Sequence, residues 1–216
     1  MRIEKLVPSQ RVQGRWLCTL DDGTLLRLGE GEVVRFALYA GMELTDALYD
    51  QLDEAARYAA VRERALDLIA ARPLSRRELL DKLTAKPRDP KKRPADPAQA
   101  EAAADWLEGL GYLNDAEYAR TVVKHYAAKG YGVRKLRDEL WKRGVPREHW
   151  DAALAELAES GQGEEAIDAL LRQKLKGRAP DEKELKRASD ALARRGYRWE
   201  EIKAALRRYG ADIEED

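Results

Sequence analysis

A phrase that occurs twice in the second half of the chain limits the possible folds more than any other feature. The first copy runs from Leu140 to Leu154 and the second from Leu192 to Leu206. In both copies a glycine lies four residues after the first leucine, a large apolar residue (Trp150 or Ile202) lies six residues after the glycine, and a leucine ends the phrase. Glycine there permits the left-handed backbone conformation that ends many helices. Each copy therefore predicts a helix, a sharp turn and a second helix, and the chain contains an internal repeat.

Helix start and stop signals extend this pattern to three copies of a three-helix unit. The helices predicted for repeats 1, 2 and 3 in turn are 61–71, 75–84 and 97–110; 115–129, 133–143 and 146–158; 164–176, 181–195 and 199–208. Residues 160–163 are predicted to be a linker. Trp106, Trp150 and Ile202 take equivalent places in the last helix of each unit and are predicted to lie in its core. Tandem units of this kind contact mainly their neighbours.

The amino-terminal part has a different pattern. Residues 16–20 and 24–28 alternate like strands around the turn signal Asp21-Asp22-Gly23, which predicts a β-hairpin. Residues 3–7 are a candidate third strand. A helix is predicted over 32–39, and helical periodicity then continues from Leu44 to Ala71, as one long helix or two.

We therefore predict a mainly α-helical protein, built as an elongated and curved tandem array of three helix-turn-helix-like repeats after a small amino-terminal β-hairpin and helix. The expected regions are residues 1–57 for the hairpin and first helices, 58–113 for repeat 1 with a basic proline-rich loop at 86–97, 114–160 for repeat 2, 161–210 for repeat 3, and 211–216 for an acidic tail. The basic loop is interpreted as a surface insertion in preference to a phosphate-binding finger.

Charge is segregated along the chain although its sum is zero, with 40 basic and 40 acidic residues. Basic residues dominate from Arg120 to Arg147, whereas the amino-terminal region and the residues after Gly210 are acid-rich. A segregated distribution of this kind is compatible with a nucleic-acid partner despite the neutral total. Ordinary solvated helix surface remains the alternative interpretation of any single cation.

The segment before the first copy of the phrase carries a resemblance to a known family. It has an Asn114-Asp start, a Tyr118-Ala pair, a basic helix, Gly130-x-Gly132 and a Leu136-x-x-x-Leu140 helix closed by Lys-Arg-Gly. This order resembles the central repeat of the RecX family, regulators of the bacterial RecA recombinase. The resemblance spans roughly residues 30–209.

The resemblance implies a regulator that binds RecA and RecA–DNA filaments and inhibits recombinase ATP hydrolysis, strand exchange and SOS-type activities. Contacts to the phosphates of single- and double-stranded DNA and a monomeric state are expected with it. The residues expected to face the filament are Arg120, Lys124, Arg134, Lys135, Arg137, Arg143, Arg147, Arg187, Arg194, Arg195 and Arg207.

The sequence lacks the motifs of several common kinds of catalytic, metal and disulfide chemistry. Cys18 is the single cysteine, so no intramolecular disulfide and no cysteine-based metal cluster can form. The sequence contains no Gly-x4-Gly-Lys-Ser/Thr phosphate loop, and His125 and His149 do not form a zinc-protease pattern. We therefore expect no catalytic residues, no metal and no cofactor. Because no signal peptide or membrane-spanning run is recognisable, a cytoplasmic protein is expected.

Two other functions remain open at this point. A three-helix unit also resembles the domain of a helix-turn-helix transcriptional regulator, which aims polar side chains at base edges. The candidate helices carry mainly arginine and lysine, with asparagine only at position 114, a composition that favours phosphate contacts over base contacts. A purely structural helical adaptor is the third interpretation.

Overall fold

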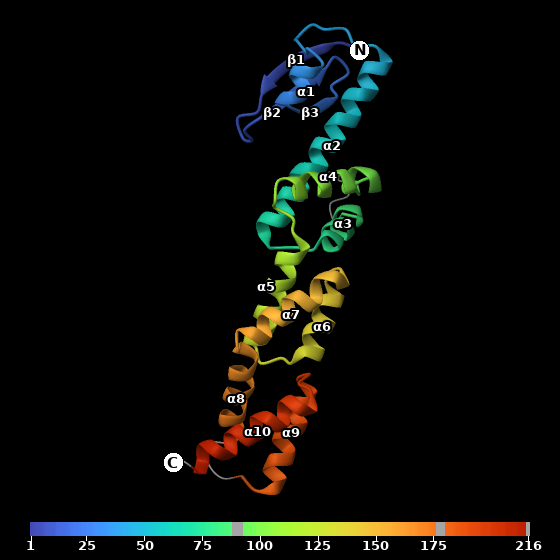
Figure 1. Ribbon diagram of the computed structural model, residues 1–216. Helices are drawn as coiled ribbons and strands as arrows, with labels where there is room; N and C mark the ends of the chain where they lie inside the picture. Colours follow the sequence, from blue (N-terminus) through green and yellow to red (C-terminus); the bar gives the residue numbers. More distant parts are fainter. Residues whose placement is uncertain (88–92, 176–179, 215–216) are drawn as a thin grey trace. The chain divides into compact units, whose positions relative to one another are not determined.

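The computed structural model describes residues 1–87, 93–175 and 180–214, with side chains up to residue 210 (Figure 1). The described chain is mainly α-helical and has a small sheet at its amino-terminal end, as predicted. It divides into two compact units. Unit 1 contains residues 1–72 and 79–112, and unit 2 contains residues 73–78 and 113–216.

The sheet has one strand more than the predicted hairpin. Strands β1 (Ile3–Pro8), β2 (Arg15–Leu20) and β3 (Leu25–Gly29) are antiparallel in the order β1-β2-β3, so the candidate third strand is present. Cys18 pairs with positions in both neighbouring strands and is fully buried. Burial raises the pKa of its thiol. The buried face packs against Leu38 and Leu44 in the connection between the first two helices, and against Leu52 on the second of these helices.

Helix α1 (Glu30–Arg35) is shorter than predicted, because the chain turns at Ala37, whose φ is positive. The stretch that was predicted to form one long helix or two forms one, α2 (Asp46–Ala71). This helix continues across the boundary that was expected near residue 57. The hydroxyl of Thr45 accepts a hydrogen bond from the backbone N–H of Leu48 at 3.2 Å and caps its start.

The other helices of repeat 1 are α3 (Arg76–Thr84) and α4 (Pro97–Gly109). The guanidinium of Arg64, on α2, donates to the carbonyl of Leu83 at 3.0 Å. Trp106 is half-buried beneath Arg62, whose guanidinium carbon lies 3.8 Å from the ring centre. Helix α4 ends one residue before the predicted bound, and Leu110 just after it is 51% exposed.

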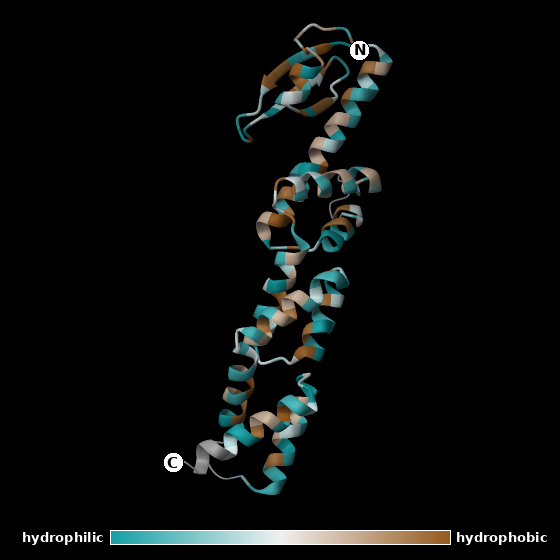
Figure 2. Cartoon of the chain, in the orientation of Figure 1, coloured by the Kyte–Doolittle hydropathy of each residue, from teal (hydrophilic) through white to brown (hydrophobic). Residues whose placement is uncertain are grey.

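Repeat 2 consists of α5 (Asp115–Ala128), α6 (Val133–Lys142), the 3-10 turn η1 (Arg147–His149) and α7 (Trp150–Glu159). Figure 2 shows that apolar positions in the repeats lie mainly where helices meet. The indole N–H of Trp150 donates to the carbonyl of Val145 at 2.9 Å. Its ring was predicted to lie in the core, but it is only partly buried and packs against the core of the repeat. Gly144 has a φ of +63°, which confirms the predicted turn.

Repeat 3 consists of α8 (Gln162–Leu175), α9 (Glu182–Arg194) and α10 (Trp199–Glu214). Its core includes the fully buried Ile202, as predicted. Two bounds differ from the predictions by two residues or more. Helix α8 begins inside the predicted linker, and α10 continues through Gly210 to Glu214 although an end at Arg208 was predicted. Glycine inside a helix costs only about 1 kcal/mol, so without a left-handed turn it does not end the helix.

Parts of two predicted segments lie outside the described residues. Residues 88–92 belong to the basic proline-rich loop, and residues 215–216 belong to the acidic tail. Within the described ranges, no helix is both long enough and apolar enough to cross a membrane.

Candidate functional site

Repeats 2 and 3 meet through direct contacts between their backbones. The N–H of Gly132, just before α6, donates to the carbonyl of Arg195 at 3.0 Å, and the N–H of Arg134 donates to the carbonyl of Gly196 at 3.1 Å. The first turn of a helix has N–H groups without partners inside the helix. The turn between α9 and α10 supplies the missing acceptors, so the start of α6 is capped by the next repeat.

Two glycines make this close approach possible. A Cβ added to Gly132 would lie 2.5 Å from both the carbonyl carbon of Gly196 and the Cα of Tyr197. A Cβ on Gly196, whose φ is +90°, would lie 2.7 Å from the backbone nitrogen of Lys135. The Gly130-x-Gly132 motif is therefore a contact point between repeats, in addition to marking the start of a helix.

Residues 73–78 make a related contact with repeat 2 inside unit 2. The hydroxyl of Ser75 donates to the carbonyl of Arg143 and accepts from the N–H of Glu78 at 3.0 Å. A Cβ on Gly144 would lie 2.8 Å from the Cβ of Arg77. Arg143 and Arg195 take the same place in the repeated phrase. The carbonyl before the turn glycine is therefore an acceptor at both junctions.

The junction between repeats 2 and 3 brings together cations that are about 60 residues apart in the sequence. Arg134 and Lys135 start α6, and Arg194 and Arg195 end α9, so the two backbone hydrogen bonds hold both pairs at one place. Arg134 and Arg194 are exposed. We call these four residues the junction cluster. Arg198, exposed in the same turn, was not among the predicted residues although it follows Arg195 by only three positions.

Arg195 also has a structural role in the junction cluster. Its guanidinium donates to the carbonyls of Lys129 at 3.0 Å and Gly130 at 3.3 Å, and it lies 5.8 Å from the ring centre of Tyr131. The side chain is half-buried by these contacts. Arg195 therefore joins repeat 3 to the loop between α5 and α6.

Several other predicted site residues form ion pairs with acids that the local charge count did not include. Glu156 on α7 lies 3.0 Å from Arg120 and 2.7 Å from Lys124. The hydrogen bond from Lys124, aided by the positive charges, lowers the pKa of Glu156. Arg137 pairs with Asp151 at 3.1 Å. The basic stretch is therefore partly neutralised by α7.

Arg143 belongs to a network around the buried carboxylate of Glu139. Its guanidinium lies 2.8 Å from a Glu139 oxygen and donates to the hydroxyl of Tyr126 at 2.8 Å. Lys142 and Lys135 lie 3.1 and 3.9 Å from the same carboxylate. Desolvation alone would raise the pKa of Glu139, but hydrogen bonds from Lys142, Tyr126 and Arg143 outweigh it, and the pKa is lowered.

The three remaining predicted cations are exposed on separate elements. Arg147 lies in η1, with its guanidinium carbon 5.9 Å from the ring centre of Trp150. Arg187 lies on α9 and Arg207 on α10. Whether any of the eleven cations contacts a partner stays a prediction.

Trp141, which is 66% exposed, was not among the predicted site residues. Its exposure could have been predicted from its position on the helix. Leu136 and Leu140 define the buried face of α6, and Trp141 lies well away from that face. An indole this exposed adds little to a core. It is therefore a candidate for binding.

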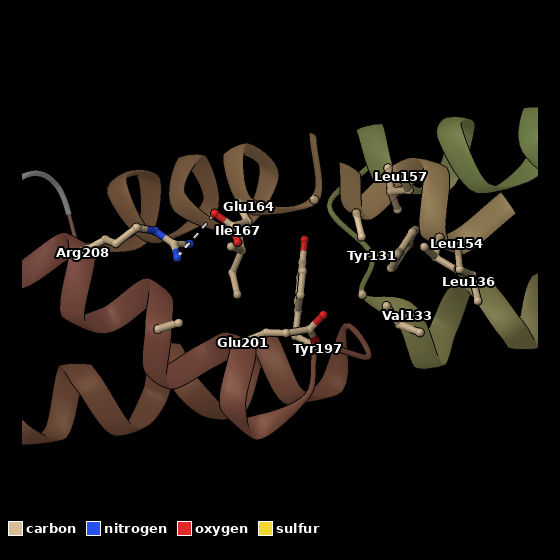
Figure 3. A pocket seen from close by; sticks show the side chains of 14 residues that line it. Tyr131, Val133, Leu136, Leu154, Leu157, Glu164, Ile167, Tyr197, Glu201 and Arg208 are labelled. Carbon is tan, nitrogen blue, oxygen red and sulfur yellow. Dashed lines mark ion pairs between the residues drawn. The ribbon is translucent and has the colours of Figure 1, made fainter. Parts of the chain in front are cut away.

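A cavity of about 170 Å³ lies between repeats 2 and 3. Figure 3 shows the ring of Tyr197 between Ile167 and Tyr131 in this cavity. The Tyr197 hydroxyl is buried and has no hydrogen-bond partner among the described residues. Burial raises its pKa to about 12.

We expect Tyr197→Phe to stabilise the protein by about 1 kcal/mol near pH ~8, because it removes an unpaired buried hydroxyl. The unfolded tyrosine loses its proton near 10.0, whereas the folded one keeps it up to about 12. The wild type therefore loses stability as the pH rises through this window, and the advantage of the variant grows. Urea unfolding at both ends of the window measures this. The exposed Tyr112→Phe control should show no such gain, and a destabilised Tyr197→Phe variant would mean that the hydroxyl is hydrogen-bonded.

Comparison with known proteins identifies the family. The model described as "RecX, second three-helix domain" matches residues 114–154, which run from the cap of α5 into α7. The "Regulatory protein RecX" of Xanthomonas axonopodis pv. citri is 38% identical over 146 residues, which cover 67% of this chain and 85% of that protein. The chain belongs to the RecX family of regulatory proteins. The RecX protein of Pseudomonas fluorescens Pf-5 is 36% identical over 71% of this chain and 94% of its own length.

Solved RecX structures share the fold. A crystal structure of regulatory protein RecX has a TM-score of 0.71 at 20% identity and covers 95% of this chain and 98% of its own. RecX from Lactobacillus salivarius has a TM-score of 0.62 at 18% identity, over 73% of this chain and 99% of its own. The resemblance seen in the sequence is thus confirmed, as is the arrangement of three-helix repeats.

Proposed function

We propose that this RecX-family protein binds the RecA recombinase and its DNA filament and inhibits recombinase ATP hydrolysis, strand exchange and SOS-type activities. It acts as a monomer in the cytoplasm, without catalysis and without a cofactor. The partner follows from family membership. The observation that supports a contact with the filament is the junction cluster, because the tertiary structure brings cations from α6 and α9 to one place.

The eleven predicted cations contribute unequally to this contact. Arg134, Arg147, Arg187, Arg194 and Arg207 are exposed, so they meet phosphate or acidic protein groups at a low desolvation cost. Arg120, Lys124 and Arg137 already have carboxylate partners, and Arg143 and Arg195 are half-buried. A cation in an ion pair must exchange one partner for another, which reduces its net gain. We therefore propose Arg134 and Arg194 as the leading contacts.

The test is single-strand-DNA-dependent ATP hydrolysis by the cognate recombinase, titrated with the chain. We expect wild-type protein to inhibit at substoichiometric amounts. The double variant Arg134→Glu/Arg194→Glu should lose at least about tenfold in potency, because each reversal replaces attraction to phosphate with repulsion. Inhibition should also weaken steeply as salt rises.

The matched control is Lys5→Glu/Arg27→Glu, which makes the same change in net charge on exposed strand residues. It should inhibit like the wild type, and circular dichroism should show equal helicity for all three proteins. Undiminished inhibition by the junction variant would contradict the assignment. A wild-type protein that leaves ATP hydrolysis unchanged but binds one duplex sequence tightly would favour the transcriptional regulator.

A further inference from the structure

Trp141 stands alone as an apolar group on a charged helix face. Of the residues from Asp115 to Glu159, all of which the structure describes, it is the only large apolar side chain that is exposed. Leu136 and Leu140, which form the buried face of α6, are fully buried. The indole is thus presented outward by a helix whose other side is held in the core.

The neighbours of Trp141 on this face are mostly basic. Arg137 precedes it by one helical turn and Arg134 by about two turns, so all three lie along one exposed strip. Lys142 follows directly, and its pKa is raised by its hydrogen bond to Glu139. Asp138 is the acid on the same strip. Arg134 also belongs to the junction cluster, which extends the positive charge toward repeat 3.

We propose that Trp141 is a stacking platform for an unpaired base of single-stranded nucleic acid. Arg134 contacts one flanking phosphate, and Arg137 contacts the other by exchanging its exposed partner Asp151 for it. This inference rests on the proposed function and names the part of the site that meets DNA. Every base offers a flat face to an indole, and the backbone on either side offers negative charge. The rise from Arg134 to Trp141 is about 10 Å along α6, which leaves room for phosphates beside the stacked base.

A protein partner fits this face less well. Anchor tryptophans in protein interfaces lie at the centre of a well-packed patch from which water is excluded. Trp141 has arginines and an aspartate around it, and α5, α6 and α7 expose no second large apolar side chain. Positive charge around a single aromatic ring complements a nucleotide, which combines a flat apolar face with an anion.

The experiment measures the affinity of the full chain for a fluorescently labelled oligothymidylate by anisotropy. Trp141→Ala should weaken binding by about tenfold, within the range known for losing one stacked base. Trp141→Phe should remain within about threefold of wild type, because a ring is kept. Tyr112→Ala, which removes a similarly exposed aromatic from outside this face, should have no effect.

Salt dependence separates stacking from charge. Trp141→Ala should keep the wild-type slope of affinity against salt, whereas Arg134→Glu should make it shallower. Binding to a blunt duplex should be insensitive to Trp141→Ala, since paired bases are not free to stack on the indole. Because Trp141 is exposed, its replacement should leave helicity unchanged, which circular dichroism checks.

Unchanged oligothymidylate affinity in Trp141→Ala would overturn the inference. If that variant instead lost only its inhibition of the recombinase, the ring would contact protein, and the inference would fail while the proposed function stood. If wild-type chain did not inhibit the recombinase but Trp141→Ala still weakened binding to the oligonucleotide, the proposed function would fail and the stacking platform would stand.

Discussion

Replacing Gly132 with alanine is expected to destabilise the contact between repeats 2 and 3 by about 3 kcal/mol. The new methyl would lie 2.5 Å from backbone atoms of Gly196 and Tyr197, which cannot rotate away as a side chain would. The two loops must separate, and the hydrogen bonds from Gly132 and Arg134 to repeat 3 are lost. Overpacking typically costs about 1–3 kcal/mol and each hydrogen bond about 1 kcal/mol.

Backbone strain does not contribute to this effect, because the φ of Gly132 is −82°, a value that alanine adopts readily. Amide hydrogen exchange is the appropriate measurement, since an array of repeats need not unfold in one step. The backbone amides at positions 132 and 134 should exchange faster in the variant than in the wild type. Gly163→Ala is the control. Its Cβ meets open space within α8, and the change should be neutral or slightly stabilising. Unaltered exchange at the junction would contradict the role given to Gly132.

Glu139→Gln is expected to cost about 2 kcal/mol near pH ~7. The change keeps the shape of the side chain but removes the negative charge that Arg143 and Lys142 share at 2.8 and 3.1 Å. Breaking a buried pair by removing one partner leaves a charge without compensation, and the partial exposure of both cations reduces the penalty.

The dependence on pH identifies the charge as the cause. The folded-state pKa of Glu139 is lowered from 4.5, so the stabilisation is complete above that value and is lost as the pH falls through the folded pKa. Wild type and Glu139→Gln should therefore converge in stability in acid. Thermal unfolding followed by circular dichroism measures the difference. Asp138→Asn, an exposed neighbour, is the control and should change stability by less than about 0.5 kcal/mol. A constant gap across the acid range would refute an electrostatic role.

Local signals were sufficient for most of the fold. The turn glycines Gly144 and Gly196 were predicted from their spacing and have the left-handed φ that the prediction required. Ser75 and Glu78 form a capping box at the start of α3. These features depend on residues within a few positions of one another, and backbone sterics and capping act over that range. The end of α10 was placed too early because glycine is only a weak helix breaker.

The candidate site was less predictable, because its charges are compensated across helices. The sequence shows Arg120 and Lys124 as members of a basic stretch, but their partner Glu156 lies on α7, more than 30 residues away. Electrostatic pairing follows distance in space, and local charge density does not report it. The gathering of Arg134 with Arg194 likewise depends on two backbone hydrogen bonds between repeats.

The helical repeats and the turns between their helices could be predicted from the residues alone, since they follow from periodicity and from the conformational freedom of glycine. The family was predicted from the order of the motifs between Asn114 and Leu140. The close approach of repeat 3 to Gly132 is visible only in the packing, because the backbone conformation of Gly132 is itself ordinary. Only the tertiary structure decided which cations are neutralised and which remain exposed, and that Trp141 faces outward. Those properties depend on neighbours that folding supplies, and packing between distant segments is what brings such neighbours together.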